Sequence, residues 1–394
     1  MSQVKSITSA DIAGKKVLCR VDFNVPLAEG KVSDDTRIKA ALPTIEYLLG
    51  QGAKLVLMSH LGRPAGTGFE AAFSLLPVAD RLAELLGKPV QFLGEVTRGD
   101  VGAQVDALKN GEVALLENLR FDSREKENDG GFCQELAALA DVYVNDAFGT
   151  AHRAHASTTG VAALLPSYAG FLLAKEVTTL SEMLAAPRRP FVAILGGSKV
   201  SDKIKVIDAL IDTCDTLIIG GGMCFTFLLA QGFEVGSSLK EEEWVERCVA
   251  TLKRAESVGV KILLPVDVVV ADRFAEDAST LTVSADKIPA NMMGLDIGPE
   301  SAALFSGAIG DAKTVFWNGP MGVFEMKAFE AGTRAVADAV AYNSEGDTII
   351  GGGDSVAAVN KFNVGDKMTF ISTGGGASME LVQGEALPGV VALQ

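Results

Sequence analysis

Arginine and histidine side chains recur in the N-terminal half of the chain, most of them shortly after a run of apolar residues, whereas Arg37 follows a strand and a loop. The set comprises Arg37, His60, Arg63, Arg120, His152, Arg153 and His155. Guanidinium groups pair with phosphate or carboxylate through two parallel hydrogen bonds, so several together suit a small anion that carries both groups. Taken singly, each arginine is more simply interpreted as a surface charge or as one half of an ion pair. Four of them at successive strand ends of an acidic protein favour an anion site for the set.

The histidines and the first strand end allow further interpretations. A lone histidine is usually a packed or capping residue, and we interpret His155 in that way. His152 and His155 have the i, i+3 spacing of a zinc pair, but no acidic or cysteine ligand lies close in sequence, which counts against a metal site. Asp22 and Asn24, in the segment VDFNVP, end the first apolar run and could bind hydroxyl groups or hold an arginine.

Glycine clusters take the corresponding positions in the C-terminal half. They are GGSK at 196–199, GGGM at 220–223, GGGDS at 351–355 and TGGGAS at 373–378. Glycine lets a ligand approach the backbone and leaves amide groups free to face an anion, and a following helix adds a partial positive charge. One cluster alone, GGGM for example, is explained by a tight turn. Four in one half indicate a ligand lying across a sheet edge.

Two lysines sharpen this interpretation. The segment SKVSDKIKVIDALI predicts a helix that places Lys199 and Lys203 in its first turn, at i and i+4. Like charges at that spacing cost roughly 0.2–0.5 kcal/mol, and they lie at the unfavourable end of the helix dipole. A bound polyphosphate would remove both penalties. The alternative is that both side chains extend into water; we favour the anion site.

Two carboxylates follow later apolar runs. Asp354 is predicted to cap the helix after GGGD, either as a plain N-cap or as an oxygen ligand for Mg²⁺ on nucleotide phosphates. Glu325 ends WNGPMGVFE and could bind ribose hydroxyls or cap the next helix. The chain contains no GxxxxGK[ST], no GxGxxG after a strand, no HRD or DFG and no GxSxG. P-loop proteins, protein kinases and serine hydrolases of those classes are therefore excluded.

The elements that must position these groups follow one pattern: a short Val, Ile and Leu-rich run, a Gly or polar residue, then a segment of helical period. This pattern is typical of an α/β protein whose parallel sheets are covered by helices on both faces. In such sheets ligands bind beyond the carboxyl ends of the strands. The segment at 170–190 has apolar residues at helical spacing and stops at Pro187 and Pro190, which predicts a connecting helix between two domains.

The composition of the chain restricts its size class, its partners and its cellular compartment. The chain has 394 residues, of which 48% are hydrophobic, enough for two cores. Its formal charge of −15 disfavours nucleic acid and anionic membranes as partners. Five scattered cysteines form no CxxC, the N-terminal segment has no apolar signal region, and no apolar run reaches the length of a membrane span. We expect a cytoplasmic protein with reduced thiols.

Nine segments together resemble the phosphoglycerate kinase family in order and spacing, over about residues 17 to 380. They are VDFNVP, SHLGRP, ENLRF, DAFGTAHRAHAS, GGSKVSDKI, GGGM, WNGPMGVFE, GGGDS and STGGGAS. The resemblance implies two Rossmann-like domains: 1–172, binding 3-phosphoglycerate or 1,3-bisphosphoglycerate, with a tail at 380–394 packing back on it, and 190–379, binding the nucleotide. A hinge helix at 173–189 would join them.

The resemblance also implies a reaction and its residues. The reaction is phosphoryl transfer from 1,3-bisphosphoglycerate to ADP, giving 3-phosphoglycerate and ATP, with Mg²⁺, in a monomer. The implied glycerate ligands are Asp22, Asn24, Arg37, His60, Arg63, Arg120 and Arg153. The implied nucleotide ligands are Lys203, Gly220, Gly221, Asn318, Glu325, Gly352, Gly353, Asp354 and Ser355, with Asp354 also holding the metal. The phosphoryl group in transfer would be surrounded by Arg37, Lys199 and the amides of Gly374 and Gly375.

Two departures from the family pattern stand out. Ser355 replaces the usual threonine and keeps the hydroxyl, and Cys224 follows GGGM where alanine is usual, at the wall of the adenine site. An acyl phosphate needs no covalent enzyme intermediate, so positioning and charge neutralisation suffice. We expect the domains to close around both substrates, with hinges near 170–190 and 375–390.

Two other functions compete with this prediction. An NAD-dependent oxidoreductase also uses glycine-rich strand ends, but GxGxxG is missing. A non-catalytic nucleotide sensor on the same fold would be indicated by loss of Arg37, Lys199 or Asp354, and all three are present.

Overall fold

The computed structural model describes residues 4–394 of the chain, which divide into two compact units. Unit 1 consists of Met1–Thr179 and Ala386–Gln394, and unit 2 of Leu180–Glu385. Each unit has its own central sheet and its own hydrophobic core. Within residues 4–394, no helix is both long and apolar enough to cross a membrane.

Unit 1 is built on a six-stranded parallel sheet in the order β5-β6-β4-β1-β7-β8. The strands are β1 (Lys16–Arg20), β4 (Lys54–Met58), β5 (Gln91–Phe92), β6 (Val113–Leu115), β7 (Val142–Asn145) and β8 (Ser167–Ala169). The side chains of the four inner strands, β6, β4, β1 and β7, are almost all buried, as expected for a parallel sheet covered on both faces. A short hairpin of β2 (Leu27–Ala28) and β3 (Lys31–Val32) follows β1.

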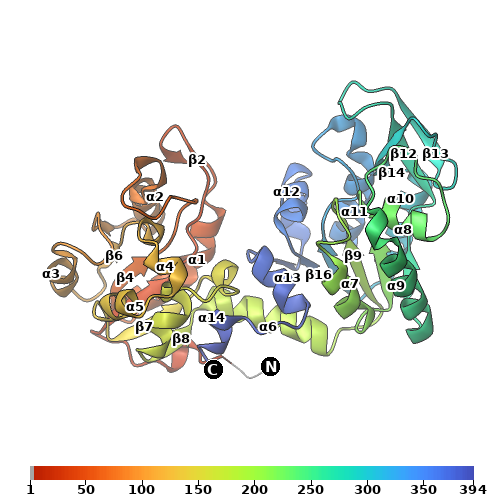
Figure 1. The fold of residues 1–394 in the computed structure, drawn as a ribbon. Helices are drawn as coiled ribbons and strands as arrows, with labels where there is room; N and C mark the ends of the chain where they lie inside the picture. Colours follow the sequence, from red (N-terminus) through yellow and green to blue (C-terminus); the bar gives the residue numbers. More distant parts are fainter. Residues whose placement is uncertain (1–3) are drawn as a thin grey trace. The chain divides into compact units, whose positions relative to one another are not determined.

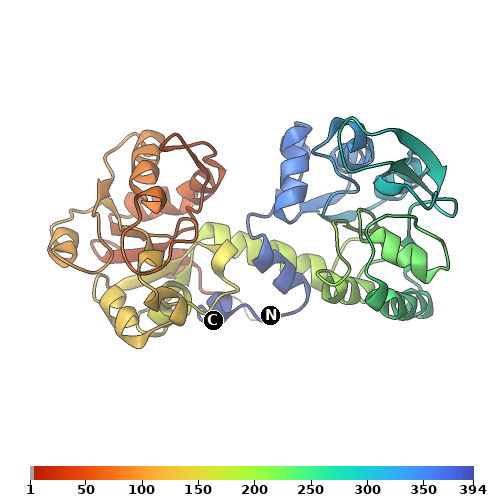
Figure 2. The same cartoon turned by 45° about the horizontal axis from the view of Figure 1, so that its top comes forward.

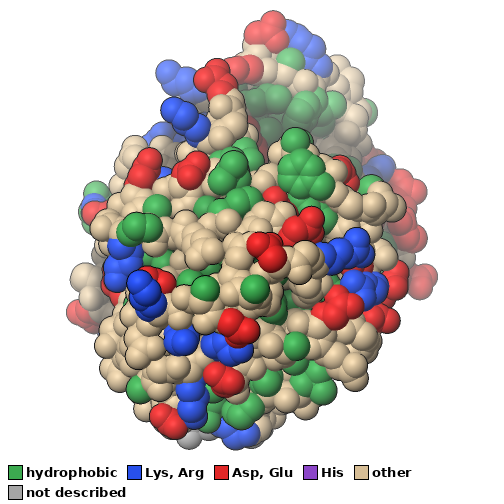
Figure 3. Space-filling view, turned by 90° about the vertical axis from the view of Figure 1, so that its left-hand side faces the viewer, with side chains coloured by type: hydrophobic (Ala, Val, Ile, Leu, Met, Phe, Trp, Pro, Cys, Tyr) green, Lys and Arg blue, Asp and Glu red, His purple; other side chains and the backbone are tan. Residues whose placement is uncertain are grey.

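Helices return the chain of unit 1 between parallel strands (Figure 1). They are α1 (Thr36–Gly50), α2 (Leu76–Leu86), α3 (Val101–Asp106), α4 (Arg124–Glu127) and α5 (Gly130–Ala137). Ile38 and Ile45 of α1 and Leu82 of α2 pack with Leu55 and Val144 of the sheet in one core. On the face of unit 1 that Figure 3 shows, acidic and basic side chains are interspersed rather than gathered by sign.

The last residues of the chain belong to unit 1. Helix α14 (Pro388–Val391) lies beside the early elements, where the dark blue end of the chain meets the red-to-yellow part in Figure 1 and Figure 2. The amide of Gly389 donates to the carbonyl of Ala151 at 2.8 Å, and the amide of Lys5 donates to the carbonyl of Leu393 at 3.1 Å. The C-terminal segment is therefore hydrogen-bonded to the loop that carries His152 and Arg153.

Unit 2 repeats the parallel plan in the strand order β11-β10-β9-β15-β16-β17. These strands are β9 (Phe191–Leu195), β10 (Thr216–Ile219), β11 (Lys261–Leu263), β15 (Thr314–Asn318), β16 (Asp347–Ile350) and β17 (Phe370–Ile371). The helices of unit 2 are α7 (Ile204–Ile211), α8 (Cys224–Ala230), α9 (Val245–Val258), α10 (Pro299–Gly310), α11 (Ala331–Tyr342), α12 (Gly353–Lys361) and α13 (Gly376–Val382). Ile194 and Trp317 of the sheet pack with Phe305 of α10 and Val336 of α11 in its core.

Unit 2 also contains a small antiparallel sheet that the sequence pattern did not predict. Its order is β13-β12-β14, with β12 (Asp267–Ala271), β13 (Thr280–Ser284) and β14 (Met293–Ile297). The apolar run KILLPVDVVVAD thus forms two strands in two different sheets, β11 and β12, because Pro265 separates them. The prediction of α/β architecture with parallel sheets covered by helices is confirmed.

Helix α6 (Phe171–Ala185) connects the two units, and the division between them falls inside it. The helix predicted in this region is confirmed, and it ends two residues before Pro187. Residues that precede proline avoid the helical conformation, which explains the position of this end.

Candidate active site

The first strand of unit 1 leads directly into a cluster of polar side chains. One carboxylate oxygen of Asp22 accepts a hydrogen bond from Nη1 of Arg37 at 3.0 Å, and the carbonyl of Asn24 accepts from the same nitrogen at 3.2 Å. The side-chain oxygen of Asn24 accepts from the amide of Gly62 at 2.8 Å. The segment after β1 therefore fixes both the N-terminal turn of α1 and the loop after β4.

His60 and Arg120 extend this cluster from the next two strands. His60 follows β4 and is 4% exposed, and Arg120 lies in a short 3₁₀ turn after β6. Nη1 of Arg120 donates to the carbonyl of Gly62 at 2.9 Å. Burial first, and then the charges of Arg20, Arg120 and Arg37, hold the pKa of His60 well below its ordinary value. That coupling places these cations around one imidazole.

Arg63 and Arg153 complete the set. Both are exposed, and neither side chain makes a hydrogen bond or ion pair within residues 4–394. The pKa of Arg120 is lowered by burial and then by nearby cations that include Arg63, and that of His155 responds to Arg153. The seven predicted glycerate ligands thus lie at or after the carboxyl ends of β1, β4, β6 and β7, with Arg63 and Arg153 available to a ligand.

His155 belongs to the scaffold of this cluster. It precedes a one-turn helical segment at Ala156–Gly160, where its amide donates to the hydroxyl of Thr158 at 3.0 Å. Burial, followed by Arg120 and Arg20, lowers the pKa of His155 to about 4. In the part of the chain that the structure describes, no three His, Cys, Asp or Glu side chains converge on a possible metal site, so the zinc alternative finds no support.

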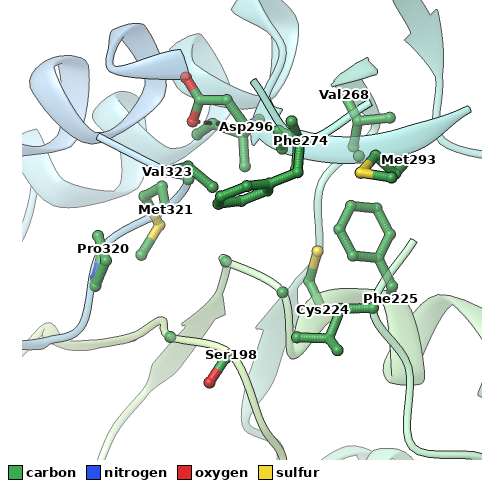
Figure 4. A pocket seen from close by; sticks show the side chains of 18 of the residues that line it. Ser198, Cys224, Phe225, Val268, Phe274, Met293, Asp296, Pro320, Met321 and Val323 are labelled. Atoms are coloured by element: carbon green, nitrogen blue, oxygen red, sulfur yellow. Dashed lines mark hydrogen bonds between the residues drawn. The ribbon is translucent and has the colours of Figure 1, made fainter. Parts of the chain in front are cut away.

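Unit 2 contains two cavities that share part of their lining. The larger, of about 750 Å³, is walled mainly by apolar side chains from α8, the antiparallel sheet and the loop after β15. Figure 4 shows the ring of Phe274 between Met321 and Val323 on one side and Phe225 and Met293 on the other. The smaller, of about 320 Å³, is lined by glycines, lysines and polar side chains. Gly197, Ser198 and Asp354 line both.

Glycine is required where the two cavities meet. Gly221 has φ of +66°, and a Cβ atom there would lie 2.5 Å from the amide nitrogen of Gly197 and 2.9 Å from the carbonyl oxygen of Pro320. Neither backbone segment can yield without moving the cavity wall. Gly220, by contrast, does not line either cavity; it packs against Met321. The GGGM cluster is therefore more than a tight turn, and its second and third glycines are the ones that line the larger cavity.

Two lysines line the smaller cavity from different environments. Lys203 is largely buried and its ammonium group contacts the side-chain oxygen of Asn318, whose amide donates to the carbonyl of Gly351 at 2.8 Å. Burial lowers the pKa of Lys203 to about 8, although Asp354 and Asp202 act in the opposite direction. Lys199 is exposed. A concave polar site with these two cations suits a polyphosphate.

The helix predicted to carry both lysines starts later than expected, so this prediction was wrong. Helix α7 begins at Ile204, and Lys203 is its N-cap residue, while Lys199 lies in the preceding loop. Glu241 provides the reason: its carboxylate accepts hydrogen bonds from the amide of Ser201 at 3.0 Å and from the hydroxyl of Ser201 at 2.5 Å. These bonds hold the segment in an open loop outside the helix. The repulsion that was predicted between Lys199 and Lys203, at positions i and i+4 of one helix, therefore does not occur.

Asp354 and Glu325 are exposed and line the cavities without capping a helix. Gly352 is the N-cap of α12, so Asp354 lies within the first turn, and the prediction that it caps this helix was wrong. Its carboxylate makes no hydrogen bond or ion pair within the described residues and is available to a ligand. Glu325 lines the larger cavity, and the cap of the following 3₁₀ turn is Met326. Ser355 is buried, and its hydroxyl accepts from the amide of Gly319 at 2.6 Å.

The last glycine cluster is arranged differently from what the sequence suggested. Gly374 is buried, and its amide donates to the hydroxyl of Ser372 at 3.1 Å. Gly375 and Gly376 line the smaller cavity, and Gly375 is the N-cap of α13. The direction of a backbone amide depends on dihedral angles that a run of identical glycines does not specify.

Several lining residues escaped the sequence prediction. They are Asp202, Phe274, Met293, Gly294, Met321, Val323 and Met379. Phe274 lies in the loop between β12 and β13, far in sequence from any glycine cluster. Because the antiparallel sheet was not predicted, no pattern pointed to its side chains as a cavity wall.

Comparison with known proteins gives one consistent answer. A family model described as phosphoglycerate kinase matches residues 7–385. The chain is 58% identical over 388 residues to the phosphoglycerate kinase of Moorella thermoacetica, covering 98% of each chain. It is 56% identical over 392 residues to that of Synechococcus sp., covering 98% of this chain and 97% of the relative.

Solved structures agree with the sequence relatives. The phosphoglycerate kinase of Coxiella burnetii superposes with a TM-score of 0.91 at 43% identity, over 99% of this chain and 98% of that one. The enzyme of Pyrococcus horikoshii superposes with a TM-score of 0.85 at 32% identity, over the same shares. The order and spacing of the nine segments, the two parallel sheets and these matches lead to one conclusion: the chain belongs to the phosphoglycerate kinase family.

Proposed function

We propose that the chain transfers a phosphoryl group reversibly between 1,3-bisphosphoglycerate and ADP, giving 3-phosphoglycerate and ATP. The observation that carries the proposal is the pair of adjoining cavities in unit 2. An apolar cavity suits a purine base, and a neighbouring cavity of glycines and lysines suits its phosphates. Family membership supplies the identity of the second substrate, whose phosphate and carboxylate match the guanidinium groups of unit 1.

In unit 1, we assign the glycerate ligands to Asp22, Asn24, Arg37, His60, Arg63, Arg120 and Arg153. Arg63 and Arg153 support this role because both are exposed and make no internal hydrogen bond or ion pair among the described residues. Arg37 remains 37% exposed at its side chain while Asp22 orients it. A guanidinium group held in this way loses less conformational entropy on binding an anion.

In unit 2, we assign the base and ribose to the larger cavity and the phosphates to the smaller one. Gly221, Glu325, Gly352, Gly353 and Lys203 line these cavities, as do Asn318, Asp354 and Ser355. Lys199 would neutralise charge on the phosphoryl group in transfer, together with Arg37 of unit 1 and the backbone at Gly375. Of the predicted ligands, Gly220 and Gly374 act instead through packing and through an internal hydrogen bond.

The residues present fit Mg²⁺ bound mainly by nucleotide phosphates and water. Mg²⁺ in such sites takes only one or two protein carboxylates, and the described residues offer no cluster that would make an all-protein cage. Asp354, uncommitted and shared by both cavities, would hold it. When bound, the ion would neutralise charge on the β- and γ-phosphates.

Direct transfer requires the donor and acceptor oxygens to be in line with the phosphoryl group. The glycerate ligands lie in unit 1 and the nucleotide ligands in unit 2, so we propose that the units close on both substrates during turnover. We further propose residues 1–172 with 380–394 as the glycerate domain, 173–189 as the hinge helix and 190–379 as the nucleotide domain.

A cytoplasmic, monomeric enzyme completes the proposal. The five cysteines are unpaired and buried thiols, as is usual in a reducing compartment. The pKa values of Cys214, Cys224 and Cys248 are raised by burial, so these sulfurs are inert thiols rather than nucleophiles. Light scattering of the purified chain would test the monomer.

The direct test is ATP- and Mg²⁺-dependent phosphorylation of 3-phosphoglycerate, coupled to NADH oxidation. We expect turnover by the parent and near-total loss with Lys199→Ala. Lys205→Ala is the matched control, because Lys205 is exposed on α7 and lines neither cavity. A folded parent that binds nucleotide but never phosphorylates 3-phosphoglycerate would refute the proposal and indicate a nucleotide sensor on the same fold.

A further inference from the structure

Beneath the exposed cations of unit 1 lies a buried chain of polar side chains, of which only His60 is among the assigned ligands. It runs from Glu125 through Ser157 and Arg20 to His60. All four are at most 4% exposed. The four residues come from α4, the turn at Ala156–Gly160, the end of β1 and the segment after β4, so this buried chain joins four separate segments of unit 1.

Arg20 is fully committed to the protein. It is 1% exposed, and three of its side-chain nitrogens are occupied. Nε donates to the hydroxyl of Ser157 at 2.9 Å, Nη1 donates to the carbonyl of Val21, and Nη2 bonds to Nδ1 of His60 at 3.0 Å. A guanidinium group arranged in this way cannot turn toward a substrate. Its function must be exerted through the residues that it holds.

The bond between Arg20 and His60 has only one possible direction. A guanidinium group carries donors and no acceptor, so Nδ1 of His60 must accept. A neutral imidazole that accepts at Nδ1 carries its proton on Nε2. Nε2 makes no hydrogen bond within residues 4–394, which leaves this N–H available as a donor to a ligand.

Ser157 and Glu125 form the other end of this buried chain of polar side chains. Because Ser157 accepts from Arg20, its hydroxyl hydrogen is directed to the carboxylate of Glu125 at 2.6 Å, and the amide of Ser157 donates to the same carboxylate at 3.0 Å. Burial raises the pKa of Glu125, while the charge of Arg20 and the bonds from Ser157 act against that rise. The hydrogen bonds from Arg20 to Ser157 and from Ser157 to Glu125 thus each have one direction, and the buried cation has a buried carboxylate near it.

The surroundings of His60 keep the imidazole neutral. The groups that face it are Arg20 from β1, Arg37 from α1, Arg120 from the turn after β6, and His155. All four are cationic or become cationic on protonation, and each adds to the effect of burial. A second proton on the ring, at Nδ1, would also break the bond from Arg20.

We propose that Arg20 is a positioning residue that holds His60 as the neutral tautomer protonated at Nε2, so that the imidazole offers the substrate one directed N–H donor. Arg20 itself touches no substrate. The consequence is selectivity: the site accepts an oxygen with a free lone pair at this position and disfavours a donor. Assigning that oxygen to the glycerate substrate rests on the proposed function, whereas the tautomer does not.

The tautomer can be read directly by long-range ¹H–¹⁵N correlation spectra of the ¹⁵N-labelled chain. The chain has three histidines, so His152→Gln and His155→Gln variants assign the signals. We expect His60 to show the pattern of a neutral ring protonated at Nε2, unchanged between pH 8 and pH 5.5. A ring protonated at Nδ1, or one that titrates near pH 6.5, would overturn the proposal whether or not the chain has kinase activity.

The role of Arg20 is then tested with Arg20→Met beside the control Arg81→Met, which removes a half-buried arginine of α2 that pairs with Asp35 and Glu84. We expect Arg20→Met to give mixed tautomers, a titration moved toward the ordinary imidazole value, and a KM for 3-phosphoglycerate raised at least tenfold. The KM for ATP should stay within twofold. Unchanged His60 signals in Arg20→Met would refute the positioning role.

A second variant tests whether the effect of Arg20→Met arises from misfolding. Arg20→Met leaves the Glu125 carboxylate without its cation, so Arg20→Met with Glu125→Gln removes both charges of the buried pair. The folded double variant should show the same mixed tautomers and the same selective rise in KM. Parent spectra with the expected tautomer but no turnover would leave the tautomer assignment standing and refute only the proposed function.

Discussion

The ammonium group of Lys203 loses part of its charge in a physiological range of pH. Burial lowers its pKa to about 8, so the free protein binds less than a full proton at this site above pH 8. Nucleotide phosphates beside it would raise the pKa again. We therefore expect nucleotide binding to take up a proton near pH 8.5, and affinity to fall by up to about tenfold per pH unit above pH 8.

Calorimetric titration of ADP in two buffers of different ionisation enthalpy measures that proton. The uptake should vanish in Lys203→Met, which also binds ADP weakly, and should persist in Lys205→Met. Lys205 is a suitable control because its side chain is 72% exposed and pairs only with Glu385. Equal proton uptake by the parent and Lys203→Met would contradict this assignment.

A second residue-scale prediction uses two glycines of like conformation. Gly221 and Gly232 both have positive φ, at +66° and +89°, but a Cβ atom meets backbone within 3 Å at Gly221 and nothing within 4 Å at Gly232. Gly221→Ala should weaken ADP binding at least tenfold because it displaces the wall at Gly197. Gly232→Ala should cost only about 1 kcal/mol of stability and leave binding unchanged. Equal ADP affinities in the two folded variants would show that the close approach is unimportant.

At this scale, residue types could be predicted and orientations could not. Lys199, Lys203 and Asp354 line one cavity, as their positions after predicted strands had suggested. The amide of Gly374 points to Ser372, and the α7 helix begins after both lysines because Glu241 binds Ser201. The first outcome depends on backbone dihedral angles that a run of glycines does not specify, and the second on a partner 40 residues away in the sequence.

At the level of helices and strands, too, the features that could be predicted were those with a local signal in the sequence. Most strands of the two parallel sheets are continuous apolar runs that were recognisable from sequence, whereas the short edge strands β5 and β8 were not. The antiparallel sheet was not, because β13 is largely exposed on both faces and lacks the alternation that marks a half-buried strand. The wall of the larger cavity was missed with it, although the glycines on the opposite wall were found.

Phe274, in the loop that joins β12 to β13, allows a test of how the antiparallel sheet contributes to the larger cavity. Its ring is 60% exposed yet lies within the lining of the larger cavity (Figure 4). Stacking of a base on an aromatic ring contributes about 1–3 kcal/mol. Phe274→Ala should therefore raise the KM for ATP by roughly tenfold or more and leave the KM for 3-phosphoglycerate unchanged.

The control for this variant is Leu281→Ala, on β13 of the same sheet and also exposed. It removes a similar apolar surface away from the cavity, and both KM values should match the parent. A rise in the KM for ATP in both variants would mean that the sheet as a whole, rather than the ring of Phe274, determines affinity.

Helix α6 is held at its first turn by the carboxyl group of Asp146, whose pKa is raised by burial. Asp146, just after β7, accepts hydrogen bonds from the amides of Leu172 at 2.9 Å and Leu173 at 3.2 Å. Burial nevertheless raises the pKa of Asp146 to about 7. A folded-state pKa above the unfolded value means that this group stabilises unit 1 fully below pH 4, and that the contribution is lost as pH rises through about 7.

Asp146→Asn should therefore gain stability relative to the parent as pH rises from 5 to 8, by an amount on the order of 2 kcal/mol. Urea unfolding at each pH, with amide exchange at Leu172 and Leu173, measures the difference. Taking the difference from the parent cancels the opposing effect of His60 and His155, whose pKa values are lowered. Asp80→Asn, at an exposed position of α2, is the control. A stability difference independent of pH would contradict the raised pKa.

The molecule as a whole separates the two halves of the proposed reaction. Each unit has its own sheet, core and set of ligand side chains, and the chain passes between units at two places, after Thr179 and after Glu385. The arginines assigned to anion binding lie in unit 1, and the glycine clusters and the large apolar cavity lie in unit 2. This division of labour could be predicted from sequence because it lies in residue type, which needs no knowledge of side-chain direction.

The same division yields the prediction for the whole chain. A phosphoryl group moves directly only when its donor and acceptor are in contact, so productive binding must bring the two ligand sets together. We expect small-angle scattering to show a smaller radius of gyration with Mg·ADP and 3-phosphoglycerate together, a pair that cannot react, than with either alone. In Arg63→Ala with Lys203→Met, which weakens both sites, the same mixture should leave the radius unchanged. Full occupancy of both sites in the parent, shown by calorimetry, without any compaction would rule out closure as the step that assembles the site.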